Sequence, residues 1–202
     1  MIDKLIELAR LCLRLGRVQR ATYHEDGKRR ESDTDHTVML SALACSVAEQ
    51  LAPHLNPGLV AQYAVVHDFR EAHAGDTVSL GIDENAAAEK EKREAAAGDL
   101  LSAEFSDSLP WLPRMIARYE RQADPEARFV RVLDKVMPAL THLLNGGVTI
   151  RELGMSVARL REANKAQRDK IAASYGADQP EAMQLLADFH ARLDEQMSEA
   201  TP

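Results

Sequence analysis

Apolar side chains recur at helical spacing along most of this 202-residue chain. In residues 2–15, isoleucines, leucines and an alanine lie three or four positions apart, so they would form one face of a helix. Aromatic residues make up only 4% of the chain, so small aliphatic residues must fill the core, which favours packed helices over sheets. The sequence predicts an all-α fold of seven or eight helices without a strand.

The breaks between these apolar stripes give the expected helix boundaries. Gly16 ends the first stripe, and Asn-Gly-Gly at 145–147 ends a long one. Further helices are expected at about 35–52, 58–68, 84–105, 109–122, 125–144, 149–174 and 180–198. Residues 16–34 form a polar connection whose length is typical of functional loops. We expect one domain over residues 1–202, with a core at about 1–147 and C-terminal helices at 148–198 packed on it.

The charge of the chain limits its partners. The formal net charge of −7 argues against a broad surface for nucleic acid polymers or anionic membranes, but one local basic pocket would suffice for a small phosphorylated ligand. Cys12 and Cys45 lie in apolar helical patterns without metal-binding or redox spacing, so we expect reduced, buried thiols. We find no signal-peptide pattern and no apolar stretch long enough to span a bilayer, and we expect a cytoplasmic protein.

Histidine and aspartate recur at three places within apolar helical runs. They are His36, the pair His67-Asp68, and Asp134. Two imidazoles and two carboxylates suit one divalent transition metal such as Mn, Co, Zn, Fe or Ni. The two carboxylates would neutralise the ion and leave positions for water and a substrate oxygen.

The ordered set His, His-Asp, Asp resembles the HD-domain metal-dependent phosphohydrolases. The stretch "HDFREAHAGD" at 67–76 is similar to the H-D-x-x-E-x-x-x-G-D pattern of the branch that contains the 5′-deoxynucleotidases. The resemblance covers residues from about 10 to 150, and after Gly147 the chain matches only in being helical. It implies an HD-type helical bundle. The metal ligands that it implies are His36, His67, Asp68 and Asp134.

The same resemblance implies roles for four further residues. Glu71 would orient the attacking water or handle its proton, and on a helix it would share a face with His67 and Asp68. Asp76 would bond the sugar hydroxyl or protonate the leaving oxygen. Arg17 would contact the phosphate. Val18 stands where 5′-deoxynucleotidases carry a tryptophan against the 2′-hydroxyl, so the preference between ribose and deoxyribose stays open.

Three functions are compatible with these residues. The first is a metal-dependent phosphohydrolase that removes the 5′-phosphate from (deoxy)nucleoside monophosphates. The second is an HD-type deoxynucleoside triphosphate triphosphohydrolase, motivated by Val18 and by the basic run Lys28-Arg29-Arg30 in the connection. The third is a non-enzymatic helical domain with a structural metal and a protein partner, although structural metal sites more often use cysteines.

Other features have simpler expected roles. Long amphipathic helices near the C-terminus, together with the resemblance, suggest a homodimer. His73 is expected to be exposed or to lie just outside the metal ligands. Ordinary structural roles are expected for His24, His54, His142 and His190.

Overall fold

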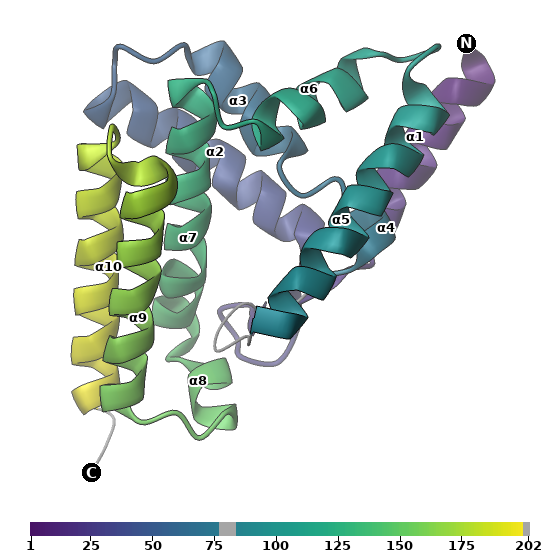
Figure 1. Ribbon diagram of the computed structural model, residues 1–202. Coiled ribbons are helices and arrows are strands. Elements are labelled where there is room, and N and C mark those ends of the chain that lie inside the picture. The colour runs from purple at the N-terminus through teal and green to yellow at the C-terminus, as the bar shows by residue number, and fades with distance from the viewer. Residues whose placement is uncertain (77–83, 200–202) are drawn as a thin grey trace.

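The computed structural model describes residues 1–76 and 84–199 and is almost wholly helical there (Figure 1). The predicted all-α fold is confirmed. The first helix, α1 (Ile2–Leu15), ends at Gly16 as the sequence predicts. No helix in the described part of the chain is long and apolar enough to cross a membrane.

The expectation that no strand would occur is wrong for the connection after α1. Strands β1 (Gln19–Tyr23) and β2 (Arg30–Ser32) pair antiparallel, and Gly27 occupies a positive φ of 65° in the turn between them. Two short strands are marginal on their own. Here Asn145 donates to the Tyr23 carbonyl oxygen at 2.8 Å and Thr149 to that of Ala21 at 2.7 Å. These bonds come from residues more than 120 positions away, so no local pattern could indicate the hairpin.

The hairpin leads directly into α2 (Asp33–Leu51). Ser32 is the N-cap, and its hydroxyl accepts from the backbone N–H of Asp35 at 3.2 Å. The Asp35 carboxylate accepts from the Ser32 backbone in return, which completes a capping box. The last strand residue therefore fixes the start of the helix that carries His36.

The middle of the chain forms five further helical segments. Their bounds are α3 (Pro57–Val66), α4 (Glu71–Ala74), α5 (Glu84–Phe105), α6 (Trp111–Glu120) and α7 (Pro125–Asn145). Helix α7 is the central one and packs on α2, α3 and β1. The main apolar core extends from Leu11 of α1 to Leu186 of the last helix.

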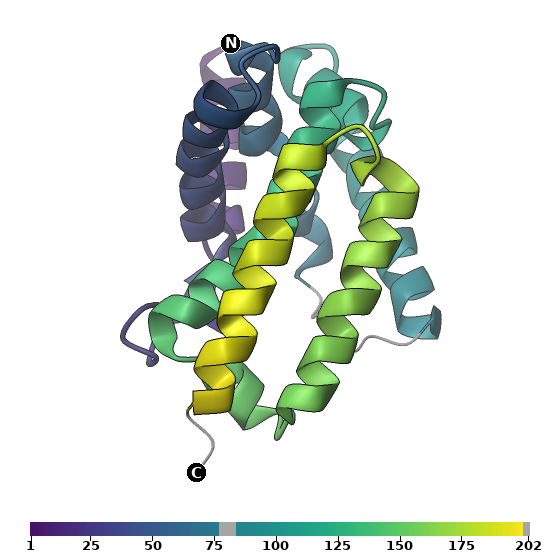
Figure 2. The same cartoon turned by 90° about the vertical axis from the view of Figure 1, so that its left-hand side faces the viewer.

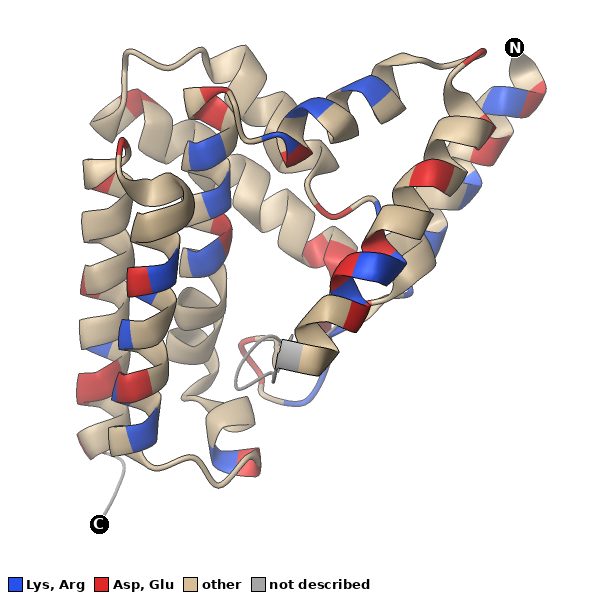
Figure 3. Cartoon of the chain, in the orientation of Figure 1, with Lys and Arg blue, Asp and Glu red and all other residues tan. Residues whose placement is uncertain are grey.

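The C-terminal part contains one more break than the sequence predicts. The expected helix at 149–174 is divided into α8 (Val148–Glu152) and α9 (Val157–Ile171), with Gly154 at φ 58° between them. A π-helical turn, η1 (Ala172–Gly176), precedes α10 (Pro180–Glu199). Helix α10 packs on both α7 and α9 (Figures 1 and 2). Helix α5 lies across from this group, and in Figure 3 acidic and basic residues are mixed on it.

Candidate metal centre and its cleft

Four side chains from three separate segments meet beside α7. His36 lies in the first turns of α2, His67 and Asp68 follow the end of α3, and Asp134 lies in the middle of α7. Each offers one donor atom, and the four atoms all lie within 4.8 Å of one another. His36 Nε2 is 3.0 Å from Asp134 Oδ1, and His67 Nε2 is 2.9 Å from Asp68 Oδ2. The structure therefore brings together all four residues that the sequence suggested as ligands.

The donor set fits a divalent transition metal. Such an ion lies about 2.0–2.2 Å from nitrogen and oxygen ligands, so adjacent donors should be about 3–4 Å apart. The crosswise distances agree, since His36 Nε2 is 3.9 Å from Asp68 Oδ2 and His67 Nε2 is 3.8 Å from Asp134 Oδ1. His67 Nε2 is buried, and because the Asp68 Oδ2 atom 2.9 Å away is not in hydrogen-bond geometry, this nitrogen makes no hydrogen bond in the described residues. A buried nitrogen without a partner is costly unless it binds an ion.

The other ring nitrogen of His67 is already held. Its Nδ1 lies 2.8 Å from the backbone oxygen of Ala64, which belongs to the last turn of α3. An N–H at Nδ1 that donates to this oxygen leaves the lone pair on Nε2, which faces the carboxylates. The end of α3 therefore sets the tautomer that metal binding requires.

An arginine that was not assigned from the sequence lies against this cluster. Arg20 of β1 donates from Nη1 to Asp68 Oδ2 at 2.9 Å and to Asp33 Oδ1 at 3.1 Å. Glu71 Oε2 is 4.0 Å from the same nitrogen. The charges of Asp68 and Asp134 raise the pKa of Arg20 despite its burial. Arg20 therefore keeps a permanent positive charge next to the candidate metal ligands.

The acidic groups around Arg20 differ in their pKa values. Burial, together with the charges of Asp68 and Asp33, raises the pKa of Glu71 to about 10. Burial and the charge of Asp68 raise the pKa of Asp33 to about 6. Burial opposes ionisation of Asp68 as well, but His67 and Arg20 outweigh it and lower its pKa. Asp68, which contacts both His67 and Arg20, therefore has a much lower pKa than the neighbouring Glu71.

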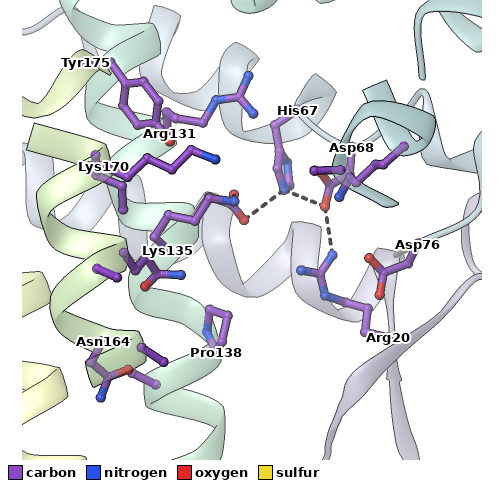
Figure 4. A pocket seen from close by; sticks show the side chains of 18 of the residues that line it. Arg20, His67, Asp68, Asp76, Arg131, Lys135, Pro138, Asn164, Lys170 and Tyr175 are labelled. Carbon is purple, nitrogen blue, oxygen red and sulfur yellow. Dashed lines mark hydrogen bonds and ion pairs between the residues drawn. The ribbon is translucent and has the colours of Figure 1, made fainter. Parts of the chain in front are cut away.

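A cleft of about 870 Å³ opens beside the cluster (Figure 4). One side holds Arg20, Asp68 and Asp76, and the opposite wall carries Lys135 and Lys170. Its volume is within the range of small-molecule sites. A buried donor set that borders an open cleft can act on a bound ligand, whereas a purely structural metal site is normally closed.

Comparison with known proteins identifies the family. The profile of the HD domain family, described as "HD domain", matches residues 12–175. The chain belongs to the HD domain family. This confirms the resemblance that the His, His-Asp, Asp order indicates. The match continues through α9 and η1, beyond the part of the chain in which the sequence motifs lie.

This HD domain is similar to three vertebrate proteins named 5′-deoxynucleotidase HDDC2. The human protein is 25% identical over 189 residues, which cover 93% of this chain and 85% of that protein. The zebrafish (Danio rerio) protein is 28% identical over 137 residues, or 67% of this chain and 66% of the relative. The bovine (Bos taurus) protein is 30% identical over 133 residues, or 65% and 62%. The matched region thus spans slightly less than two thirds of the fish and bovine relatives.

A solved structure resembles this HD domain over nearly its whole length. It is described as a predicted metal-dependent phosphohydrolase from Magnetospirillum magnetotacticum, with a TM-score of 0.74, 25% identity, and coverage of 98% of this chain and 96% of that one. A conserved hypothetical protein from Pyrococcus furiosus shares the fold, with a TM-score of 0.53 and 23% identity.

The remaining residues suggested from the sequence divide into two groups. Glu71 is 5% exposed beside Asp68 and Arg20, and Asp76 lines the cleft. Arg17 is exposed just after α1 and is not among the residues that line the cleft. Val18 is half-buried and contributes a backbone oxygen that accepts from Asp33 N–H at 3.2 Å. The structure thus brings Glu71 and Asp76 to the cleft but not the pair Arg17-Val18.

Arg20 could have been found if the strand had been recognised. In a strand, alternate side chains point to the same face, so Arg20 and Thr22 share one face of β1. Thr22 is buried and Arg20 reaches the cluster, so this is the inward face. The stretch "LGRVQR" contains both arginines, and only the strand geometry distinguishes them.

Proposed function

We propose that this HD domain is a metal-dependent phosphohydrolase that removes the 5′-phosphate from (deoxy)nucleoside monophosphates. The observation that carries the proposal is the position of Arg20. This arginine lies 2.9 Å from the candidate ligand Asp68, at the border of the cleft. A phosphate held there would face both a fixed positive charge and the four metal-binding side chains. The names of the vertebrate relatives and of the bacterial structure support the same reaction class.

His36, His67, Asp68 and Asp134 would hold one divalent transition metal such as Mn, Co, Zn, Fe or Ni. When bound, such an ion lowers the pKa of water and polarises the phosphoryl group. Arg20 would orient the phosphate through charge-assisted bonds from its guanidinium. In the reaction, a water oxygen bonds to phosphorus and the bond to the 5′-oxygen breaks.

Glu71 and Asp76 would move the protons. The water loses a proton as it attacks, and the leaving 5′-oxygen must gain one. A bound cation beside Glu71 would favour its ionised form, so that Oε2, which is buried and has no hydrogen bond in the described residues, could accept the proton of the water. Asp76, on the cleft wall near Arg20, would contact the sugar or protonate the leaving oxygen.

The structure of the hairpin gives less support to a triphosphate substrate than the basic run Lys28-Arg29-Arg30 in the sequence suggests. Arg30 stacks over Tyr23 and lies 3.8 Å from Glu152, and Arg29 lies 3.6 Å from Asp35. Neither arginine is among the residues that line the cleft, and the same holds for Lys28. The alternative of a structural metal in an interaction domain is disfavoured by the open cleft. A homodimer and a cytoplasmic location stay predictions.

The test uses metal-stripped protein reloaded with Mn²⁺, Co²⁺, Zn²⁺ or Mg²⁺. Each form is assayed against matched panels of ribo- and deoxynucleoside mono- and triphosphates, and the products are separated as phosphate, pyrophosphate and tripolyphosphate. We expect phosphate from the monophosphates alone. Tripolyphosphate from the triphosphates would establish the second function instead, and no product from either panel in the metal-loaded protein would contradict the proposal.

A further inference from the structure

The hairpin brings a second buried carboxylate to the metal centre, behind His36. Glu31 of β2 is 1% exposed, and its Oε1 lies 3.2 Å from His36 Nδ1. Its other oxygen, Oε2, accepts from the Thr22 hydroxyl of β1 at 2.5 Å. Thr22 thus fixes one oxygen of the carboxylate and leaves the other one facing the histidine.

We propose that Glu31, held by Thr22, is the positioning residue that prepares His36 for the metal. The proposal rests on the metal site of the proposed function, but it does not depend on the identity of the substrate. Glu31 Oε1 is buried and makes no hydrogen bond in the described residues, and it approaches His36 Nδ1 to 3.2 Å. A carboxylate buried in this way needs a donor, and the contact with His36 offers the Nδ1–H.

The consequence for His36 follows from the two nitrogens of its ring. A proton held on Nδ1 by Glu31 leaves Nε2 with the lone pair, and Nε2 is the nitrogen next to Asp134 and Asp68. A negatively charged acceptor at Nδ1 also makes the imidazole a stronger ligand. His67 has a neutral backbone acceptor in the same position, so the two histidines should differ in how much their acceptors contribute.

The hairpin is anchored on its outer side by contacts that do not reach the metal centre. The Tyr23 hydroxyl donates to Glu152 Oε1 at 2.9 Å, and Arg30 lies 3.8 Å from the same carboxylate. Glu152 therefore offers a matched control. A Glu152→Gln change removes a charge from the support of the hairpin and leaves Thr22, Glu31 and His36 unaltered.

The experiment measures Co²⁺ affinity without any nucleotide. Metal-stripped wild type, Glu31→Ala, Glu31→Gln, Thr22→Val and Glu152→Gln are titrated with Co²⁺ against a chelating dye, and the visible spectrum of bound Co²⁺ is recorded. Loss of an outer partner of a metal-binding histidine typically weakens metal affinity about 10–100-fold. We expect such a loss for Glu31→Ala and a smaller loss for Thr22→Val. Glu31→Gln should partly restore the affinity, because its amide oxygen can still accept from Nδ1–H. Glu152→Gln should bind Co²⁺ with wild-type affinity.

Two results would overturn the proposal. The first is a Co²⁺ affinity within twofold of wild type in the Glu31 variants and in Thr22→Val. The second is a loss of Co²⁺ affinity in Glu152→Gln as large as that in the Glu31 variants, which would mean that the hairpin supports the site only in a general way. Thermal melting of the metal-free proteins shows which variants fold. If Glu31→Ala does not fold, Glu31→Gln and Thr22→Val still test the proposal. Co²⁺ binding that depends on Glu31 in a protein without phosphohydrolase activity would overturn the proposed function alone.

Discussion

Two pairs of buried histidines border α7 and differ in their surroundings. His36 and His67 face carboxylates, and although burial opposes its charge, hydrogen bonds with Asp134 and Glu31 raise the pKa of His36 to about 9. His142 lies near the end of α7, and His190 lies in α10. Burial lowers the pKa of each to about 4, and for His190 the charge of Arg168, 2.8 Å away, adds to this.

The difference shows that burial alone does not make a histidine a ligand. All four side chains are no more than 6% exposed. Around His36 and His67 the carboxylates supply negative charge that can be shared with a cation. For His142, by contrast, burial outweighs the charge of Glu31, and for His190 burial and the charge of Arg168 act together, so the pKa of each falls. His36 and His67 should therefore determine metal content, and His142 and His190 should contribute to stability.

Replacement of a histidine of the first pair should have the largest effect. In His36→Asn or His67→Asn, we expect loss of the bound metal and a fall in phosphate release of more than the 10–100-fold typical of an outer partner, because a direct donor is removed. Metal analysis and a phosphate assay measure the two losses. His142→Gln and His190→Gln should retain the metal, and loss of the ion in these variants would remove the distinction between the pairs.

A cavity made at Leu193 should lower stability without changing metal affinity. Leu193 is 2% exposed in the small apolar cluster with Leu160 and Met197. Leu193→Ala should lower the free energy of unfolding by about 2–5 kcal/mol, as buried leucine truncations do, and should leave Co²⁺ affinity unchanged. Urea unfolding of the metal-free protein gives the first quantity. A large change in Co²⁺ affinity would show that the C-terminal cluster and the metal centre are coupled.

Conservative changes of two arginines test which one binds phosphate. Arg20→Lys keeps the charge but loses the planar fork, so we expect kcat/KM to fall about 10–100-fold, which corresponds to about 1.5–3 kcal/mol for charge-assisted bonds. Arg17→Lys should change kcat/KM less than about threefold, since a surface substitution changes a free energy by about 0.5 kcal/mol at most. Steady-state kinetics with a nucleoside monophosphate decide the matter. The reverse ranking would restore Arg17 as the phosphate residue.

The pH dependence of stability should have opposite signs for His142 and His36. A depressed pKa means that the unfolded state of His142 binds a proton more readily, so stability falls as the pH decreases from about 6.5 toward 4. At pH 5.5 this loss is about 1 kcal/mol for one histidine, and it should be absent in His142→Gln. The raised pKa of His36 stabilises the metal-free protein below pH 6.5, and this contribution is lost as the pH rises through about 9. Unfolding curves measured between about pH 4 and about pH 9 give the free energy of unfolding at each pH and so show whether either sign is wrong.

The sequence predicted those parts of the site that lie within regular helical patterns. His36 and Asp134 lie within helices that the sequence predicts, whereas His67 and Asp68 lie just after α3, which ends at Val66 and not at 68 as expected. The resemblance to the HD-domain phosphohydrolases then implied that these four residues bind one metal together. His142 and His190 are both buried, and their ordinary structural roles stay predictions.

The parts that the sequence did not reveal depend on contacts across the chain. Arg20, Thr22 and Glu31 reach the metal centre only because residues 19–32 form a hairpin, and that hairpin is held by Asn145 and Thr149. A polar connection has no periodicity that could indicate this pairing. The break at Gly154 was missed for a similar reason, since the apolar residues continue on both sides of it.

We propose that one divalent transition metal binds to His36, His67, Asp68 and Asp134. The most direct measurement is a calorimetric titration of metal-stripped wild type and Asp134→Asn with Co²⁺. We predict one ion per chain for the wild type and no measurable binding in the variant, since the carboxylate that faces both imidazoles loses its charge. A wild-type protein that binds no Co²⁺, or an Asp134→Asn protein that still binds one ion with wild-type affinity, would contradict the account.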